Sequence, residues 1–135
     1  MPSLTRWFLK AALVYLMLAL CLGILLALPG ASRISGIFPV YLHLLTFGWL
    51  TQLIFGIALW MFPKYALTFP RGPEWLGWST FVLLNLGLVL RMVFEPIHAQ
   101  AASSLSGGML VMAALLLWLS GIAFLANTWK GVGEK

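Results

Sequence analysis

Aspartate is absent from this chain, which has only three acidic residues, two histidines and a single cysteine. One cysteine cannot form an intrachain disulfide, and iron–sulfur and cysteine-rich zinc sites are excluded as well. The Cys-x-x-Cys-His sequence for covalent heme and the glycine-rich phosphate loop are also missing. Because carboxylates and histidines are so few, we expect neither a hydrolytic metal centre within one chain nor catalysis by this polypeptide alone.

Charge of either sign is scarce. Charged residues make up 8% of the 135 residues, whereas a soluble domain is roughly a quarter charged. Hydrophobic residues make up 62%, and the mean hydropathy is +1.02. The net charge of +5 does not indicate nucleic-acid binding, because the positive residues are scattered between apolar runs. We therefore predict an all-α integral membrane protein whose partner is the lipid bilayer.

Four long apolar runs predict a bundle of four transmembrane helices in a single domain, residues 1–135. The predicted helices cover residues 7–28, 38–62, 74–94 and 105–129. Pro29-Gly30 is expected to end the first helix and Glu95-Pro96 the third, whereas Pro39 is tolerated in a first turn. The first run also has the charged start of a signal peptide, but its apolar part is too long for one, so we favour a retained helix.

The positive residues predict the orientation. Six of the eight lie on the side of both termini: Arg6, Lys10, Lys64, Arg71, Lys130 and Lys135. The positive-inside rule makes this side cytoplasmic, and we expect a multi-pass protein of a bacterial inner (cytoplasmic) membrane. Most tryptophans cluster at the same side as an interfacial belt. Trp49 and Trp118 are deeper and are expected to pack between helices.

His43 is the leading functional candidate, because an ionisable group inside an apolar run is unfavourable unless it has a role. It lies about one turn inside the second helix, on the outer side of the predicted membrane. The loop predicted between the third and fourth helices brings His98 to the same side, together with Arg33, Arg91 and Glu95. Two interpretations remain open for His43, namely a cofactor ligand or a histidine that only hydrogen-bonds a neighbouring helix.

The second helix has two contrasting faces at about 100° per residue. One face is apolar and carries His43, Phe47, Leu50, Ile54, Ile57 and Met61. The opposite face carries Gly48, Gln52 and Gly56, a small-residue pattern that favours close packing of another helix. The first face would suit a flat, apolar cofactor.

In the third helix, Asn85 is a polar group at mid-membrane depth and needs a partner. Thr80, Leu84, Gly87 and Arg91 lie on one stripe of this helix. Arg91 and Glu95 are one turn apart and can pair. Arg91 would alternatively suit the carboxylates of a cofactor, but on the sequence alone we favour the ion pair.

Residues 43–56, followed by Trp60-Met61-Phe62-Pro63, resemble the second helix of heme-copper oxidase and nitric oxide reductase catalytic subunits. The shared pattern is a histidine, two glycines at the spacing of Gly48 and Gly56, and a terminal proline. The segment also resembles a helix of the NnrS membrane heme-protein family, and residues 90–96 are similar to a segment of such relatives. The resemblance covers roughly the middle third of the chain.

The resemblance implies that His43 is an axial ligand of a heme b iron, with His98 or a histidine of another subunit as the second metal ligand. It implies that Arg33 or Arg91 lies near the heme carboxylates and that Phe47 belongs to the cofactor site. The implied role is electron transport in a respiratory chain, or handling or sensing of a diatomic gas.

A complete oxidase or reductase is not implied, because those enzymes have many more helices and histidines. One alternative is a cofactor-free accessory or assembly subunit of a respiratory membrane complex, and another is a small transporter or channel component. The expected protein partners are a second copy of the chain or a larger respiratory complex.

Overall fold

A computed structural model describes residues 1–62 and 72–133. The described residues form four spans that are long and apolar enough to cross a membrane, which confirms the predicted all-α fold of four transmembrane helices. The elements in order are α1 (Ser3–Ala27), η1 (Ala31–Arg33), α2 (Ile37–His43), η2 (Leu44–Thr51), α3 (Gln52–Met61), α4 (Glu74–Gln100) and α5 (Ser104–Gly133). The three elements α2, η2 and α3 form one continuous span. Lys64, Arg71 and Lys135 lie outside the described residues, and the cytoplasmic orientation stays a prediction.

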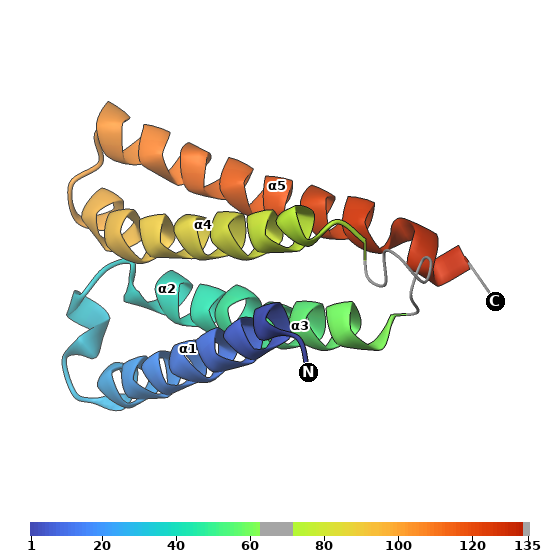
Figure 1. Ribbon diagram of the computed structural model, residues 1–135. Coiled ribbons are helices and arrows are strands. Elements are labelled where there is room, and N and C mark those ends of the chain that lie inside the picture. The colour runs from blue at the N-terminus through green and yellow to red at the C-terminus, as the bar shows by residue number, and fades with distance from the viewer. Residues whose placement is uncertain (63–71, 134–135) are drawn as a thin grey trace.

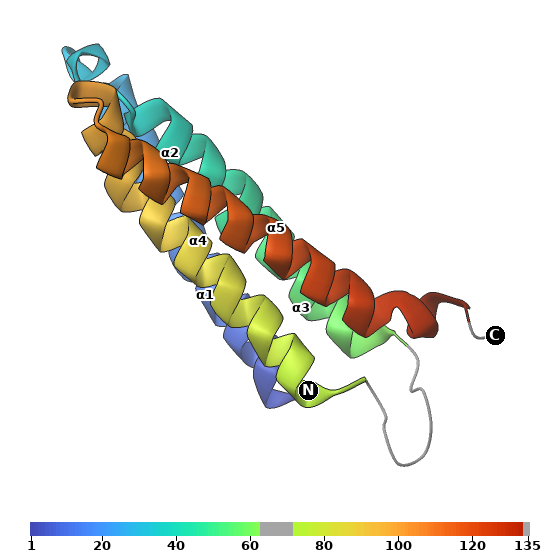
Figure 2. The same ribbon diagram turned by 90° about the horizontal axis from the view of Figure 1, so that it is seen from above.

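The helices form two antiparallel hairpins that lie side by side (Figure 1). In the first hairpin α1 packs along α2–η2–α3, and in the second α4 packs along α5. Figure 2 shows that all the spans share one long axis. The starts of α1 and α4 and the end of α5 lie at one end of the bundle, here named the Glu74 end. The opposite end, with η1, His43 and the α4–α5 connection, is named the His43 end.

The interior of the bundle is narrow and closely filled. Its fully buried hydrophobic side chains include Phe8, Leu44, Leu84 and Leu88. Aromatic contacts join the two hairpins, because the Phe8 ring on α1 meets the Phe81 ring on α4 edge-on with 5.1 Å between centroids. Phe55 on α3 and Phe124 on α5 stack with 3.9 Å between ring centroids.

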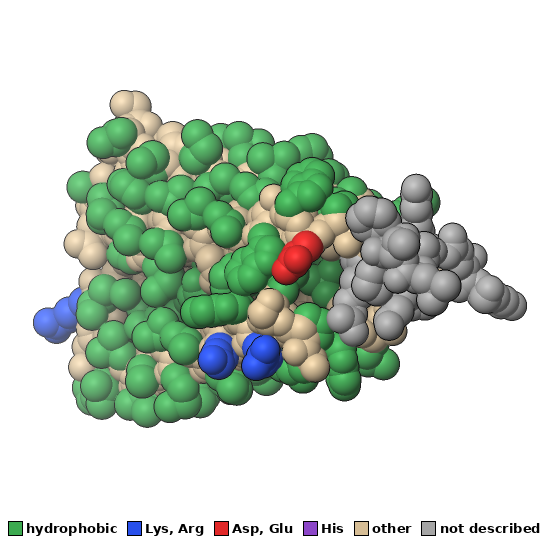
Figure 3. Space-filling view, in the orientation of Figure 1, with side chains coloured by type: hydrophobic (Ala, Val, Ile, Leu, Met, Phe, Trp, Pro, Cys, Tyr) green, Lys and Arg blue, Asp and Glu red, His purple; other side chains and the backbone are tan. Residues whose placement is uncertain are grey.

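The outer surface is also hydrophobic, as a surface facing lipid chains should be. Figure 3 shows one face of the bundle covered mainly by apolar side chains, with few charged groups. Cys21 is exposed on this outer surface. Trp118, expected to pack between helices, is 63% exposed, so that expectation is wrong.

The predicted close-packing face of the second span contacts α1. A methyl group built on Gly48 would lie 2.7 Å from Cβ of Tyr15, and one on Gly56 would lie 2.8 Å from Cβ of Phe8. Gln52 between them is fully buried. The absence of side chains at the two glycines therefore lets α1 approach the backbone of the second span.

The π-helix η2 keeps the residues of this close-packing face on one side of the span. Its hydrogen bonds span five residues and widen each turn, and the Thr51 hydroxyl donates to the carbonyl of Thr46, five residues earlier, at 2.8 Å. In a straight α-helix, residues four apart drift by about 40° around the axis. The wider turns offset this drift, so one buried stripe runs along the span: Val40, Leu44, Gly48, Gln52 and Gly56.

Helix α4 does not end at Phe94 as predicted but continues through Pro96 to Gln100. Proline removes one backbone donor, which usually ends a helix. Here the turn before α2 packs closely against the extension. A methyl group added at Gly36 in this turn would lie only 2.8 Å from Cα of Pro96. His98 consequently lies on a helix, and the loop predicted for it is wrong.

Candidate functional site

His43 is the last residue of α2, immediately before the π-helix η2. Its Nδ1 lies 2.7 Å from the carbonyl oxygen of Pro39, one turn earlier. A carbonyl oxygen only accepts, so Nδ1 carries the proton and donates. In a neutral imidazole this leaves the lone pair on Nε2. Metal-binding histidines are commonly held in this way, with one ring nitrogen donating to a backbone carbonyl and the other free to bind.

Two charged side chains of α4 lie beside His43. The Glu95 Oε2 atom is 3.8 Å from Nδ1 of His43 and 3.4 Å from Nη1 of Arg91. The side chains of Glu95 and Arg91 are largely buried, with 16% and 21% exposed. The predicted Arg91–Glu95 pair is therefore confirmed, and it also faces the histidine of the second span. We name His43, Arg91 and Glu95 the outer polar cluster.

Arg91 keeps an unused donor inside this cluster. Its Nε is buried and has no hydrogen-bond partner among the described residues. A buried donor without an acceptor is unfavourable. Arg91 is thus held in the cluster through its Nη1 bond to Glu95, while its Nε stays enclosed by neighbouring side chains.

Phe47 lies one turn after His43, and the two rings are nearly parallel, 15° apart with 6.0 Å between centroids. Beyond this pair, the apolar strip predicted on the same face is open to the outside. Leu50 is 49% exposed, Ile54 53% and Met61 70%. The sequence therefore placed a histidine and an aromatic ring correctly above an apolar strip.

His98 makes its hydrogen bond to helix α5. Its Nδ1 lies 2.8 Å from the hydroxyl of Ser106 on α5. Ser106 and Ser103 also form a reciprocal cap at the start of α5, because each backbone N–H donates to the other hydroxyl at 3.1 Å. His98 thus supports the α4–α5 connection, whereas His43 contacts Pro39 and Glu95.

The remaining candidate, Arg33, is exposed on η1. The described residues contain no group of three or more histidine, cysteine, aspartate or glutamate side chains that could hold a metal ion. At the His43 end, the described residues bring together one histidine, one glutamate and one arginine.

A buried polar network lies between the spans at mid-depth. Asn85 Oδ1 accepts from the Tyr15 hydroxyl at 3.0 Å and from Gln52 Nε2 at 3.2 Å. Asn85 Nδ2 donates to the carbonyl of Phe81 at 2.7 Å. The sequence indicated that Asn85 needs a partner, but it did not identify Tyr15, which reads as an ordinary apolar-run residue. The network links α1, α3 and α4.

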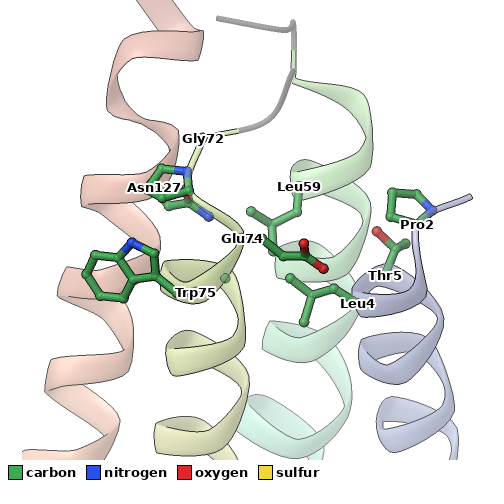
Figure 4. A pocket seen from close by; sticks show the side chains of 10 residues that line it. Pro2, Leu4, Thr5, Leu59, Gly72, Glu74, Trp75 and Asn127 are labelled. Atoms are coloured by element: carbon green, nitrogen blue, oxygen red, sulfur yellow. The ribbon is translucent and has the colours of Figure 1, made fainter. Parts of the chain in front are cut away.

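A pocket of about 660 Å³ opens at the Glu74 end, far along the bundle from His43 (Figure 4). Its polar lining includes Thr5, Glu74 and Asn127, and its apolar lining includes Leu4 and Leu59. Figure 4 shows these side chains converging from the ends of all four spans. The Glu74 carboxylate accepts from Trp78 Nε1 at 3.4 Å.

The comparisons with known proteins identify no relative of this chain. No family model matches the chain, and no curated protein or solved structure matches it. The resemblance to oxidase helices consequently depends on the residues quoted above. The outer polar cluster must be interpreted from its own geometry.

Proposed function

We propose that this chain is a small membrane heme protein of the b type, in which His43 is an axial ligand of the iron. The observation that carries the proposal is the bond of 2.7 Å between Nδ1 of His43 and the carbonyl of Pro39, which leaves the Nε2 lone pair for a metal. A heme supplies four iron ligands from its own ring, so one protein histidine is enough to hold it. The absence of a multi-residue metal cluster among the described residues is compatible with this cofactor.

Three features of the surroundings of His43 support the proposal. Phe47 offers a parallel aromatic ring, and the exposed strip below it offers apolar surface for a macrocycle. Arg91 lies next to His43 through Glu95 and brings a positive charge, which would pair with a heme carboxylate. When bound, the heme would supply a one-electron iron centre. The residues of this chain would hold it, keep the His43 tautomer and balance the carboxylate charge.

The proposed setting is a bacterial inner membrane, with a role in electron transfer or in handling a diatomic gas. Only the multi-pass membrane architecture is established. The heme function, the membrane and the redox partner are parts of the proposal.

The test is the reduced-minus-oxidised spectrum of the full chain purified from heme-replete cells. We expect a Soret band and b-type α and β bands that disappear in His43→Ala. His98→Ala is the matched comparison, because Nδ1 of His98 also has a hydrogen-bond partner, the Ser106 hydroxyl. Unchanged bands in His98→Ala would assign the ligand to His43 alone, and altered bands would make His98 the second ligand. A colourless wild-type protein would remove the proposal, and its co-purification with a larger complex would favour an accessory subunit.

A further inference from the structure

The pocket at the Glu74 end is separate from the heme proposed at His43. Its volume of about 660 Å³ is within the range of pockets that hold small ligands. Three of its lining residues, Thr5, Leu59 and Asn127, each lie two residues from the end of a membrane-spanning segment. Two residues of helix correspond to about 3 Å. The pocket therefore lies where the spans meet one surface of the membrane.

The space inside the pocket depends on a glycine. Gly77 of α4 lines it, and a methyl group built there would lie 2.5 Å from Cδ2 of Leu4 and 3.5 Å from Nδ2 of Asn127. Leu4 and Asn127 also line the pocket and come from α1 and α5. A side chain at position 77 would therefore occupy part of the pocket and push the tip of Leu4 aside.

Polar groups on three helices line this space. Glu74 of α4 is the one charged side chain among the described lining residues, and Figure 4 shows its carboxylate extending toward Thr5 on α1. Thr5 is 1% exposed and Asn127 on α5 is 3% exposed, so both polar side chains are enclosed by the bundle and do not face lipid. The pocket thus offers one negative charge, a hydroxyl and an amide within a largely apolar lining.

The Glu74 carboxylate has acceptor capacity for a ligand. Its bond from Nε1 of Trp78 is long, at 3.4 Å, and a carboxylate has about four acceptor positions. A ligand that matches this group carries a positive charge and hydrogen-bond donors. Because the pocket lies at the membrane surface, the headgroup of a lipid can reach it.

We propose that this pocket binds the headgroup of an aminophospholipid, with the primary ammonium on Glu74. A primary ammonium has three N–H donors and no acceptor. The two carboxylate oxygens of Glu74 and the hydroxyl oxygen of Thr5 supply acceptors for them, and bonds to a carboxylate are stronger than neutral ones. The amide nitrogen of Asn127 can donate to a phosphate or ester oxygen of the same lipid. The acyl chains would remain in the bilayer beside the pocket.

This chemistry distinguishes lipid classes. The quaternary ammonium of phosphatidylcholine has the same charge as an ethanolamine headgroup but no N–H donor. A headgroup with only negative charge would be repelled by Glu74. Favourable placement of Glu74 in the first turn of α4 holds the carboxylate in place but does not by itself select one headgroup over another. Headgroup selection is therefore the property to measure.

The first test measures lipid retention by native mass spectrometry. The full chain is released from nanodiscs that contain equal amounts of phosphatidylethanolamine and phosphatidylcholine with identical acyl chains. Wild type should retain several-fold more phosphatidylethanolamine than phosphatidylcholine. Equal retention of the two lipids would overturn the proposal.

Two variants test the charge and the space separately. Glu74→Gln keeps the shape of the side chain but removes its charge, and Gly77→Ala fills part of the pocket. Both should lose the preference for phosphatidylethanolamine. Gly121→Ala is the matched control for the second variant, because nothing lies within 4 Å of a methyl group there, and it should keep the preference. Circular dichroism establishes that each variant is folded, and an unchanged preference in either folded variant would overturn the proposal.

A third measurement separates a lipid headgroup from a free amine. Octylamine and octyltrimethylammonium have the same alkyl chain and charge, but only octylamine has N–H donors at its charged end. Octylamine should displace phosphatidylethanolamine from wild type, and octyltrimethylammonium at the same concentration should not. Displacement by both compounds to the same extent would overturn the role of the N–H donors. Binding of octylamine by a chain that retains the two lipids equally would overturn the lipid and assign the pocket to a free amphipathic amine.

Discussion

The close contact of Gly48 with α1 allows the packing of the first hairpin to be tested with a single methyl group. In Gly48→Ala, the new Cβ would meet Cβ of Tyr15 at 2.7 Å and Cγ at 2.8 Å. A rotamer change moves Cγ of Tyr15 but leaves its Cβ in place on the α1 backbone, so the clash with Cβ is relieved only if α1 moves. Such overpacking costs about 1–3 kcal/mol.

Gly108→Ala is the control for this substitution. Nothing lies within 4 Å of a methyl group at Gly108, so only the helix preference of alanine acts there, a gain of about 0.5–1 kcal/mol. The same gain applies at Gly48 and cancels when the two variants are compared. Gly48→Ala should therefore be less stable than Gly108→Ala by about 1–3 kcal/mol, the overpacking term alone.

The assay is reversible unfolding in mixed micelles by titration with sodium dodecyl sulfate, followed by circular dichroism. A double-mutant cycle adds Tyr15→Phe, which removes the hydroxyl that donates to Asn85 at 3.0 Å. Hydrogen bonds between membrane helices contribute about 0.6 kcal/mol on average, and this loss should shrink in the Gly48→Ala background because the ring has moved. Equal stability of Gly48→Ala and Gly108→Ala would refute the close approach of α1.

Two further predictions use the same unfolding assay. Ser103→Ala removes the hydroxyl that accepts from the Ser106 N–H at the start of α5 and should lower the free energy of unfolding by about 1 kcal/mol, whereas exposed Ser104→Ala should not. Similar losses in the two variants would argue against the cap. Ser120→Ala removes the buried bond of 2.9 Å to the carbonyl of Thr80 and should cost about 0.6–1.7 kcal/mol. Ser79→Ala, whose hydroxyl bonds its own helix, should cost less, and the reverse order would contradict the role of this contact between α4 and α5.

Much of the fold follows from the sequence because membrane spans are specified by composition and length. The four spans, the Gly48 and Gly56 face and the Arg91–Glu95 pair all appear as predicted. These features depend on short-range spacing along one helix, and such spacing is visible in the sequence. The need of Asn85 for a partner was visible for the same reason.

The features that the sequence did not reveal depend on contacts between helices. Proline at position 96 predicts a helix end, but α4 continues to Gln100, and the turn at Gly36 packs against it. The π-helix η2 has no distinctive residue pattern, and it shows only in the five-residue spacing of its bonds. The prediction that Trp118 packs between helices was wrong because lipid-facing and protein-facing apolar residues have the same hydropathy. The pairing of His98 with Ser106 likewise appears only once α4 is extended.

The polar network of Tyr15, Gln52 and Asn85 has a consequence for biogenesis. Its members come from both hairpins, with Tyr15 and Gln52 in the first and Asn85 in the second. Until the hairpins dock, Asn85 is left in the bilayer with little more than the carbonyl of its own helix as a partner. An undocked chain thus displays a polar amide to lipid, which is unfavourable because hydrocarbon offers it no hydrogen-bond partner. Docking of the two hairpins removes this cost by supplying Tyr15 and Gln52, so the network favours the assembled bundle over separate hairpins.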